Sequence, residues 1–187
     1  MIENNNLLIK IDEWRTELGN SEKHIHFAFL ENFIEFEKFL TISFLNYALG
    51  EEGKDEYKPT RRIEFSDKEH FEGLLKCDKK YIDYIKKIQE VKRFIFHEDS
   101  CPFNKVFSSA EFMSHFKQMQ VIRNYITHQS EESKNQYIKK VLEPNGIPTF
   151  IKVDTFLKRI NRQQSVSNYS IYIESLKFHS EVICNPI

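Results

Sequence analysis

The stretch Ser108–Leu142, SSAEFMSHFKQMQVIRNYITHQSEESKNQYIKKVL, decides how the rest of the chain is interpreted. Its first half carries apolar residues at spacings of four, three and three, namely Phe112, Phe116, Met119 and Ile122. This period predicts an amphipathic helix near residues 109–129. Ser108 and Glu111 form a Ser-x-x-Glu pattern, which predicts that Ser108 caps the start of this helix.

A polar group of residues stands at the end of this helix, in Arg123-Asn124-Tyr125-Ile126-Thr127-His128. On a continuous helix, Arg123 and His128 point about 140° apart, because each residue turns by about 100°. Asn124 and His128 are four residues apart and therefore share a face. Either the helix breaks before His128, or each site draws its arginine and its histidine from two subunits. Both alternatives predict a composite site.

These residue types suit phosphate chemistry. A histidine titrates near neutral pH and can transfer a proton. An arginine presents a planar cation that can hold a phosphate and stabilise charge that develops on it. A neighbouring asparagine can orient the imidazole or bind a ribose hydroxyl. Arg123 and His128 are therefore the candidate catalytic residues, and Asn124 is a supporting residue.

The pattern Arg-Asn-x-x-x-His, placed late in a series of helices, resembles the Rx4-6H motif of HEPN-domain proteins, a superfamily that includes RiboL-PSP-like and related bacterial toxin and anti-phage ribonucleases. The resemblance implies an all-α, HEPN-like helical bundle. It also implies a metal-independent endoribonuclease in which the RNA 2′-hydroxyl attacks the adjacent phosphate. His128 would act as general base or acid, Arg123 would stabilise the transition state, and Asn124 would orient these groups.

The resemblance further implies partners: an RNA substrate, a second copy of the chain in a homodimer with a composite active site, and an antitoxin or a defence complex. It implies no cofactor and no metal. One residue departs from the family pattern. Some HEPN toxins carry a tyrosine two residues after the histidine, which a nucleotidyltransferase antitoxin modifies, but this chain has Ser130 there. Control by another kind of antitoxin stays open.

The rest of the chain also favours helices. Only five Gly and five Pro occur in 187 residues, which is typical of helical folds rather than turn-rich β folds. We expect one domain over residues 1–187, with an N-terminal helical extension (1–20) and a charged loop (51–66). A long early helix runs from about Glu22 to Leu49 and ends at Gly50.

Further helices are expected after Asp78, from about Glu131 to Leu142, and from about Asn168 to Ile183. The helix after Asp78 is basic, with Lys79, Lys80, Lys86, Lys87, Lys92 and Arg93. Those cations form either a surface for the RNA backbone or a solvated helix face, which is the more common case.

Smaller elements complete the sequence interpretation. Residues 149–153 predict a short extended segment, and Asp154 is expected to cap the short helix that follows. His115 is expected to be a structural histidine on the packed face of its helix. Lys134 and Tyr137 could reach the Arg123–His128 segment from the next helix.

Composition limits the classes of function. The net charge is −1 and the isoelectric point about 6.7, so bulk charge does not predict nucleic-acid binding, and RNA would need a local basic patch. The three cysteines, Cys77, Cys101 and Cys184, show no metal-binding spacing and fit a reducing cytoplasm. No signal peptide and no apolar run of about 18 residues is evident, so we expect a cytoplasmic protein without a membrane span.

Two other interpretations stay open. In the simplest, Arg123 and Asn124 lie on a helix surface and His128 is a C-terminal helix residue whose charge suits the helix dipole. In the second, the chain is a non-catalytic HEPN-like dimer that binds RNA, a nucleotide or a protein. Apart from these two, a third possibility is a purely structural helical adaptor within a larger defence complex.

Overall fold

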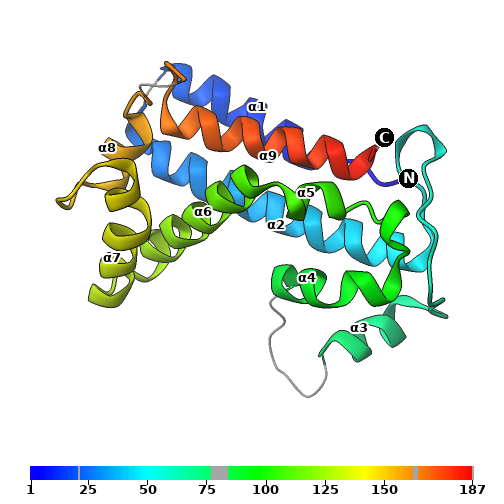
Figure 1. The fold of residues 1–187 in the computed structure, drawn as a ribbon. Coiled ribbons are helices and arrows are strands. Elements are labelled where there is room, and N and C mark those ends of the chain that lie inside the picture. The colour runs from blue at the N-terminus through cyan, green and yellow to red at the C-terminus, as the bar shows by residue number, and fades with distance from the viewer. Residues whose placement is uncertain (21, 77–83, 162–163, 187) are drawn as a thin grey trace. The chain divides into compact units, whose positions relative to one another are not determined.

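The computed structural model describes residues 1–20, 22–76, 84–161 and 164–186. These residues form helices joined by turns, with two isolated β-bridges and no strand (Figure 1). The all-α class expected from the sequence is therefore confirmed. None of the described helices is long and apolar enough to cross a membrane.

Contacts group the chain into two compact units. Unit 1 comprises Met1–Asn5, Phe36–Ser109 and Phe178–Ile187, and unit 2 comprises Asn6–Glu35 and Ala110–Lys177. The α-helices are α1 (Asn5–Asn20), α2 (Ile25–Leu49), α3 (Lys68–Lys76), α4 (Tyr84–Ile95), α5 (Asn104–Ser108), α6 (Ala110–His128), α7 (Glu131–Tyr137), α8 (Val153–Lys158) and α9 (Asn168–Cys184). The organisation as a single domain stays a prediction.

Unit 2 packs the predicted apolar stripe of α6 against α2 and the first part of α9. Phe112, Phe116, Met119 and Ile122 are all buried, as the sequence predicts. The ring of Phe116 lies 5.5 Å from that of Phe33 in α2, measured between centroids. Phe29, one turn earlier on α2, meets the ring of Tyr172 in α9 at 6.0 Å. These contacts fix α6, and with it the Arg123–His128 segment, on the core of unit 2.

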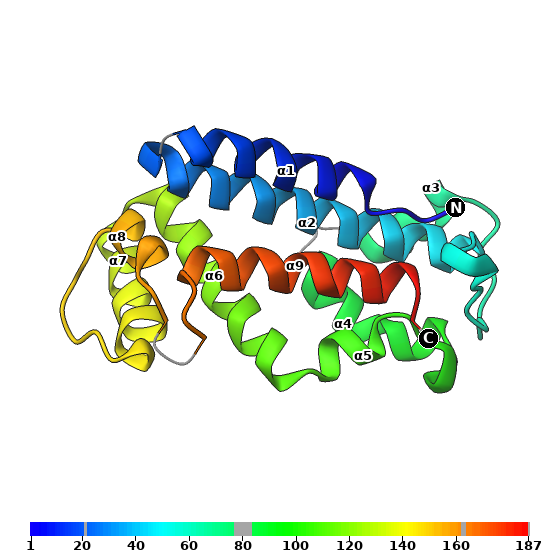
Figure 2. The ribbon, with the colours of Figure 1, turned by 90° about the horizontal axis from the view of Figure 1, so that it is seen from above.

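The helix that follows α6 is also placed as expected. It runs as α7 from Glu131 to Tyr137 and continues as a π-helical turn, Ile138–Leu142. Tyr137 is buried, and its ring stacks on Tyr125 at 5.2 Å and meets Phe156 of α8 edge-on. In Figure 2, which looks down from above, α8 overlaps α7, and Figure 1 shows α8 above α7 in unit 2.

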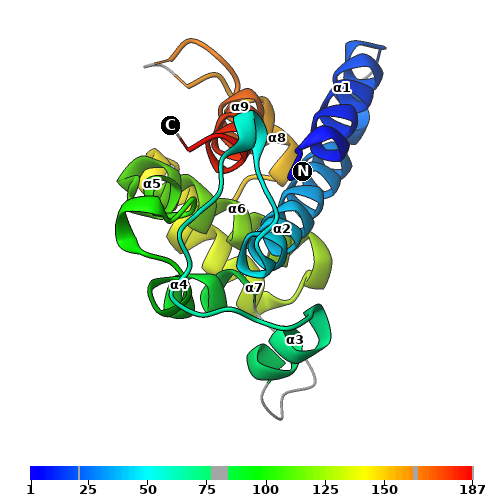
Figure 3. The same cartoon turned by 90° about the vertical axis from the view of Figure 1, so that its right-hand side faces the viewer.

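Unit 1 is built on rings that surround the second half of α2. Phe44 contacts Phe71, Phe96 and Phe103, with centroid separations of 5.6, 6.2 and 5.7 Å. The hydroxyl of Tyr47 donates to the backbone oxygen of Ile183 at 2.7 Å, which ties α9 to α2. The charged loop runs between α2 and α3, as Figure 3 shows. Its Arg61 pairs with Phe96 in a β-bridge.

Helix starts differ from the sequence predictions. Ser108 is not the cap of α6, because it is the last residue of α5 and its hydroxyl donates to the oxygen of Lys105. Ser109 precedes α6 instead, with extended backbone angles.

Asp154 does not cap α8 either, because the helix begins one residue earlier, at Val153. The Asp154 carboxylate instead forms a hydrogen bond with His26. The expected extended segment at 149–153 forms no strand, although Lys152 has extended backbone angles. Asp78, Lys79, Lys80 and Cys77 lie outside the described residues.

Candidate functional site

Helix α6 continues through the whole Arg123–His128 segment and ends at His128. The helix therefore does not break before His128, which removes one of the two alternatives drawn from the spacing. The turn comes at Gln129, whose φ is +47° and whose N–H donates to the oxygen of Tyr125 at 3.0 Å. Ser130 then caps α7 by accepting a hydrogen bond from the N–H of Ser133.

The Arg123 side chain turns toward Asn124. Its Nη1 donates to Asn124 Oδ1 at 3.0 Å. Asn124 lies one turn before His128, so their Cβ atoms are neighbours on the helix surface, about 5–6 Å apart. The long arginine side chain thus bends toward the face that Asn124 and His128 share. The angle of about 140° describes only the directions of the Arg123 and His128 Cβ atoms. It does not describe where the end of a long arginine side chain lies.

The face formed by these residues is open. Asn124 and His128 are exposed, whereas Arg123 is half-buried at the margin of the packed face. No described residue forms a hydrogen bond or ion pair with the His128 imidazole. Both of its ring nitrogens are therefore available to an incoming group.

Lys134 and Tyr137, which could reach this segment from the following helix, make their contacts with other residues. Tyr137 reaches it only through the stack on Tyr125. Lys134 pairs with Glu131 at 3.3 Å, and its Nζ lies 5.4 Å from the centre of the Phe150 ring. Neither residue forms a hydrogen bond or ion pair with the His128 side chain in the described part of the chain.

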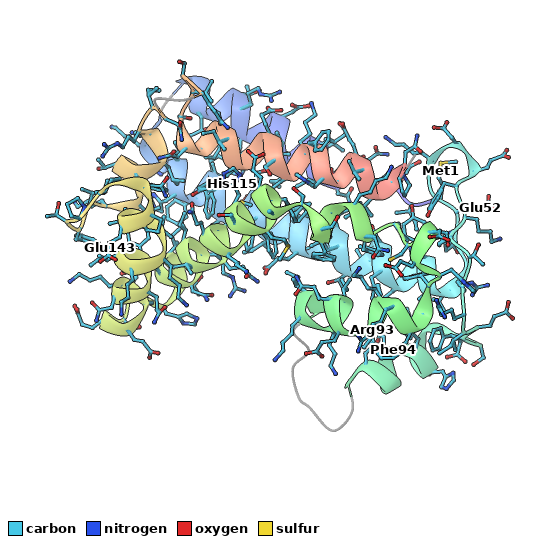
Figure 4. All side chains as sticks on the ribbon, viewed as in Figure 1. Met1, Glu52, Arg93, Phe94, His115 and Glu143 are labelled. Carbon is cyan, nitrogen blue, oxygen red and sulfur yellow. The ribbon has the colours of Figure 1, made fainter. Side chains whose placement is uncertain are left out.

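His115 has the structural role that the sequence predicts. It lies half-buried on α6, and its ring meets that of Tyr172 edge-on at 5.7 Å (Figure 4). Burial lowers the pKa of His115, because desolvation disfavours the charged imidazole, and nearby Glu111 only partly offsets this effect. The side chain is thus a packing residue of unit 2.

A pocket of about 230 Å³ adjoins the Arg123–His128 segment within unit 2. We call it the aromatic pocket, and six residues that line it are Tyr125, Gln129, Phe150, His26, Lys152 and Asp154. Tyr125 comes from the last turns of α6 and Gln129 directly follows that helix, whereas the others come from α2, α8 and the segment before α8. The last turns of α6 therefore contribute both to the face that Asn124 and His128 share and to the aromatic pocket.

The aromatic pocket contains a histidine–carboxylate pair that the sequence did not reveal. His26 Nδ1 lies 2.6 Å from Asp154 Oδ1, and both side chains are partly exposed. A carboxylate next to Nδ1 favours the tautomer that carries its proton on Nδ1. Nε2 of the neutral ring is then free to accept a hydrogen bond or a proton from a ligand. The two residues are 128 positions apart, so no local spacing could have indicated the pair.

Metal binding finds no support at the motif or elsewhere in the described residues, since no cluster of three or more His, Cys, Asp or Glu side chains occurs there. The neighbouring residues His97, Glu98, Asp99 and Cys101 form no such cluster either. A larger hollow of about 450 Å³ lies beside Arg159 and Asn168, but Asn168 is engaged there with the oxygen of Phe156 at 2.9 Å.

Comparisons with protein-family models, with curated proteins and with solved structures find no match to this chain. The resemblance to HEPN proteins therefore depends on the Arg123–His128 segment and on the order of the helices alone. What the structure adds is the arrangement around that segment: an exposed histidine, an arginine bonded to the intervening asparagine, and an adjoining aromatic pocket.

Proposed function

We propose that this protein is a metal-independent endoribonuclease of the HEPN type, a toxin or defence component that acts in the cytoplasm. The observation that carries the proposal is the hydrogen bond of 3.0 Å from Arg123 to Asn124, next to an exposed His128. It directs the guanidinium toward Asn124, which lies one turn before His128 on the same helix face. A cation and a proton-transferring group on one open face are what phosphate-ester cleavage without a metal requires.

In this mechanism the 2′-hydroxyl of the RNA loses its proton to a base and attacks the adjacent phosphorus. The guanidinium of Arg123 binds the phosphate oxygens, where negative charge grows in the transition state. Asn124 holds the guanidinium through its Oδ1 and leaves its own amide N–H groups for a ribose or phosphate oxygen. The leaving 5′-oxygen takes a proton from an acid, and the strand ends in a 2′,3′-cyclic phosphate.

The reaction needs both a base and an acid, whereas the motif of one chain offers one exposed histidine. A homodimer that brings two motifs face to face would supply the second imidazole from the other copy. This is the composite site that the sequence spacing predicts. An antitoxin or a defence-complex partner would then act by covering this face or by separating the two copies.

A second candidate is a non-catalytic dimer that binds RNA, a nucleotide or a protein. The aromatic pocket is the observation that favours it, because a pocket with ring walls and polar groups needs no reaction to be useful. The two candidates differ in one respect that can be measured: only the first turns over its RNA.

The deciding experiment compares wild type with His128→Ala on total RNA and transfer RNA, with EDTA present. We expect cleavage by wild type and a loss of about 10²–10⁴-fold in the variant, the usual contribution of general acid–base catalysis. The matched control is His97→Ala, which removes another exposed histidine, in unit 1, and should leave the rate unchanged. Product ends should be 2′,3′-cyclic phosphate or 3′-phosphate.

The other outcomes are equally informative. If folded wild type cleaves neither RNA, the binding candidate is favoured, or the enzyme requires an activator. If cleavage persists in His128→Ala, the reaction belongs to other residues. If EDTA abolishes cleavage by wild type, the reaction depends on a metal and the proposed mechanism is wrong.

A further inference from the structure

We propose that the aromatic pocket binds one unpaired nucleobase and selects bases that carry an exocyclic amino group. That this base belongs to the RNA strand at the Arg123–His128 site rests on the proposed function. The binding of the base itself does not. The pocket would make the protein selective among RNA sequences, a property that the motif residues cannot supply, because they address the phosphate and the ribose.

The position of the pocket makes it suitable for a neighbouring nucleotide. Tyr125 lies within the motif segment and Gln129 directly follows it, and both line the pocket. On α6 the direction of Tyr125 is about 160° from that of Arg123 and about 60° from that of His128, at about 100° per residue. The pocket therefore opens beside the motif face rather than on it. Its volume of about 230 Å³ lies below the range of about 300–1,000 Å³ usual for whole ligands, so it fits one ring system.

Two rings set at a right angle form the apolar walls. The Tyr125 and Phe150 planes are 88° apart, with centroids separated by 6.1 Å. Tyr125 is held from behind by its stack on buried Tyr137, and Lys134 lies over Phe150. A base can stack on one ring and contact the other with its edge. Because Tyr125 is held by its stack on a buried ring, that wall loses little side-chain entropy when a base enters.

The polar groups suggest which base edge is recognised. Asp154 uses Oδ1 for His26, and no described residue forms a hydrogen bond with Oδ2. An ionised carboxylate only accepts hydrogen bonds, so Oδ2 requires a donor on the ligand. Adenine, cytosine and guanine carry an exocyclic amino group, whereas uracil does not. Lys152 is exposed at the same pocket and can pair with the phosphate attached to the base.

The test titrates the purified protein with 5′-AMP, 5′-CMP, 5′-GMP and 5′-UMP and follows binding by nuclear magnetic resonance. We expect the three amino-bearing nucleotides to bind about tenfold more tightly than 5′-UMP, because uracil would leave the carboxylate unpaired. Phe150→Ala should weaken all of them by about tenfold or more, as loss of base stacking does. Phe178→Ala is the matched control, since it removes another exposed phenylalanine, in unit 1.

Asp154→Asn gives the sharpest result. If the amide oxygen keeps the bond to His26, the amide nitrogen replaces the Oδ2 acceptor with a donor. The preference should then turn toward 5′-UMP, whose ring carbonyl at that position accepts a hydrogen bond. Equal binding of all four nucleotides by wild type, no binding, or wild-type affinity in Phe150→Ala would overturn the proposal.

A final arm separates this proposal from the proposed function and identifies the source of the base. His128→Ala should bind the nucleotides like wild type, whether or not wild type cleaves RNA. A short single-stranded oligoribonucleotide that displaces 5′-AMP from His128→Ala shows that the pocket accepts a base within a strand. Failure to displace it shows that the pocket takes a free nucleotide, and the base-binding proposal then stands without its link to RNA cleavage.

Discussion

Helix α4 in unit 1 and the end of α6 in unit 2 both carry cationic groups that the sequence offered for RNA, yet these groups have different surroundings. On α4, Lys86 and Lys87 lie 3.9 and 3.8 Å from the carboxylate of Glu90. Pairs of this kind are typical of a solvated helix surface and add little stability each. They also reduce the positive field that an RNA backbone would meet.

The cations in the last turn of α4 also have local partners. Lys92 donates to the side-chain oxygen of Asn104, and the guanidinium of Arg93 lies 4.7 Å from the centre of the Phe94 ring (Figure 4). Over its described residues, these local pairings favour a solvated helix face for α4, and the choice between the two alternatives stays a prediction. Its charges serve local pairing.

The end of α6 carries fewer charges, and what distinguishes it is His128 rather than an accessible cation. His128 is exposed without a hydrogen-bonding partner in the described part of the chain, and half-buried Arg123 is directed to Asn124, which shares a face with His128. The difference shows that the number of cations on a helix does not locate a site. What matters is which polar groups the fold leaves available, and the net charge of −1 is compatible with a site of this local kind.

The largest effect that tests this comparison is on stability. Phe44→Ala in unit 1 and Phe116→Ala in unit 2 each remove a buried ring, and each should cost about 3–5 kcal/mol of unfolding free energy. Because α2 and α9 each contribute residues to both units, we expect one cooperative transition in both variants. Urea unfolding followed by circular dichroism, with hydrogen exchange on α4 and α6, measures this. Two separate transitions would show that the single-domain prediction is wrong.

The next effect is on activity and compares the two arginines directly. Arg123→Ala should lower RNA cleavage by about 10²–10³-fold, the usual loss when one group that stabilises transition-state charge is removed. Arg93→Ala on α4 removes the same charge and should change the rate by less than about threefold. Arg123→Lys should recover little, since lysine keeps the charge but lacks the planar fork. Equal losses in Arg93→Ala and Arg123→Ala would mean that the two helices share the RNA.

The features of the fold that depend on local periodicity could be predicted from the sequence. The buried stripe from Phe112 to Ile122, the end of α2 before Gly50 and the helix after Ser130 follow from spacing and from the conformational preferences of single residues. Helix starts were less accurate. Ser108 and Ser109 can both precede a helix, and only the packing of α5 decides between them.

Long-range pairs were beyond the reach of the sequence patterns. His26 and Asp154 meet because α2 and α8 pack together, and neither residue stands in a pattern that suggests the other. The same holds for Tyr125 and Phe150, whose rings form the walls of the aromatic pocket. The candidate motif could thus be found from the sequence, whereas the pocket beside it required the fold.

The smallest effect compares two helix ends. Helix α2 is followed by Gly50 with φ +93°, where an added Cβ would lie 2.8 Å from Arg61 Nη2, whereas α6 is followed by Gln129 with φ +47°. Gly50→Ala should therefore destabilise by about 1–2 kcal/mol, the cost of a left-handed conformation for a residue with a side chain. Gln129→Gly should stabilise by about 0.5–1 kcal/mol, because glycine is the preferred residue at such an end. Thermal unfolding of both variants measures the two signs.

The Gln129→Gly variant is useful because its stability and its affinity for 5′-AMP can both be compared with those of wild type. Among the described residues, the only partner of the Gln129 side chain is the oxygen of Ile126, at a long 3.4 Å, so its loss costs little there. A strained residue that lines a pocket suggests that the side chain is retained for a ligand rather than for the fold. A variant that is more stable and binds 5′-AMP less tightly would support that conclusion. A variant that is more stable and binds equally well would make Gln129 a tolerated strain and leave base selection to Asp154 alone.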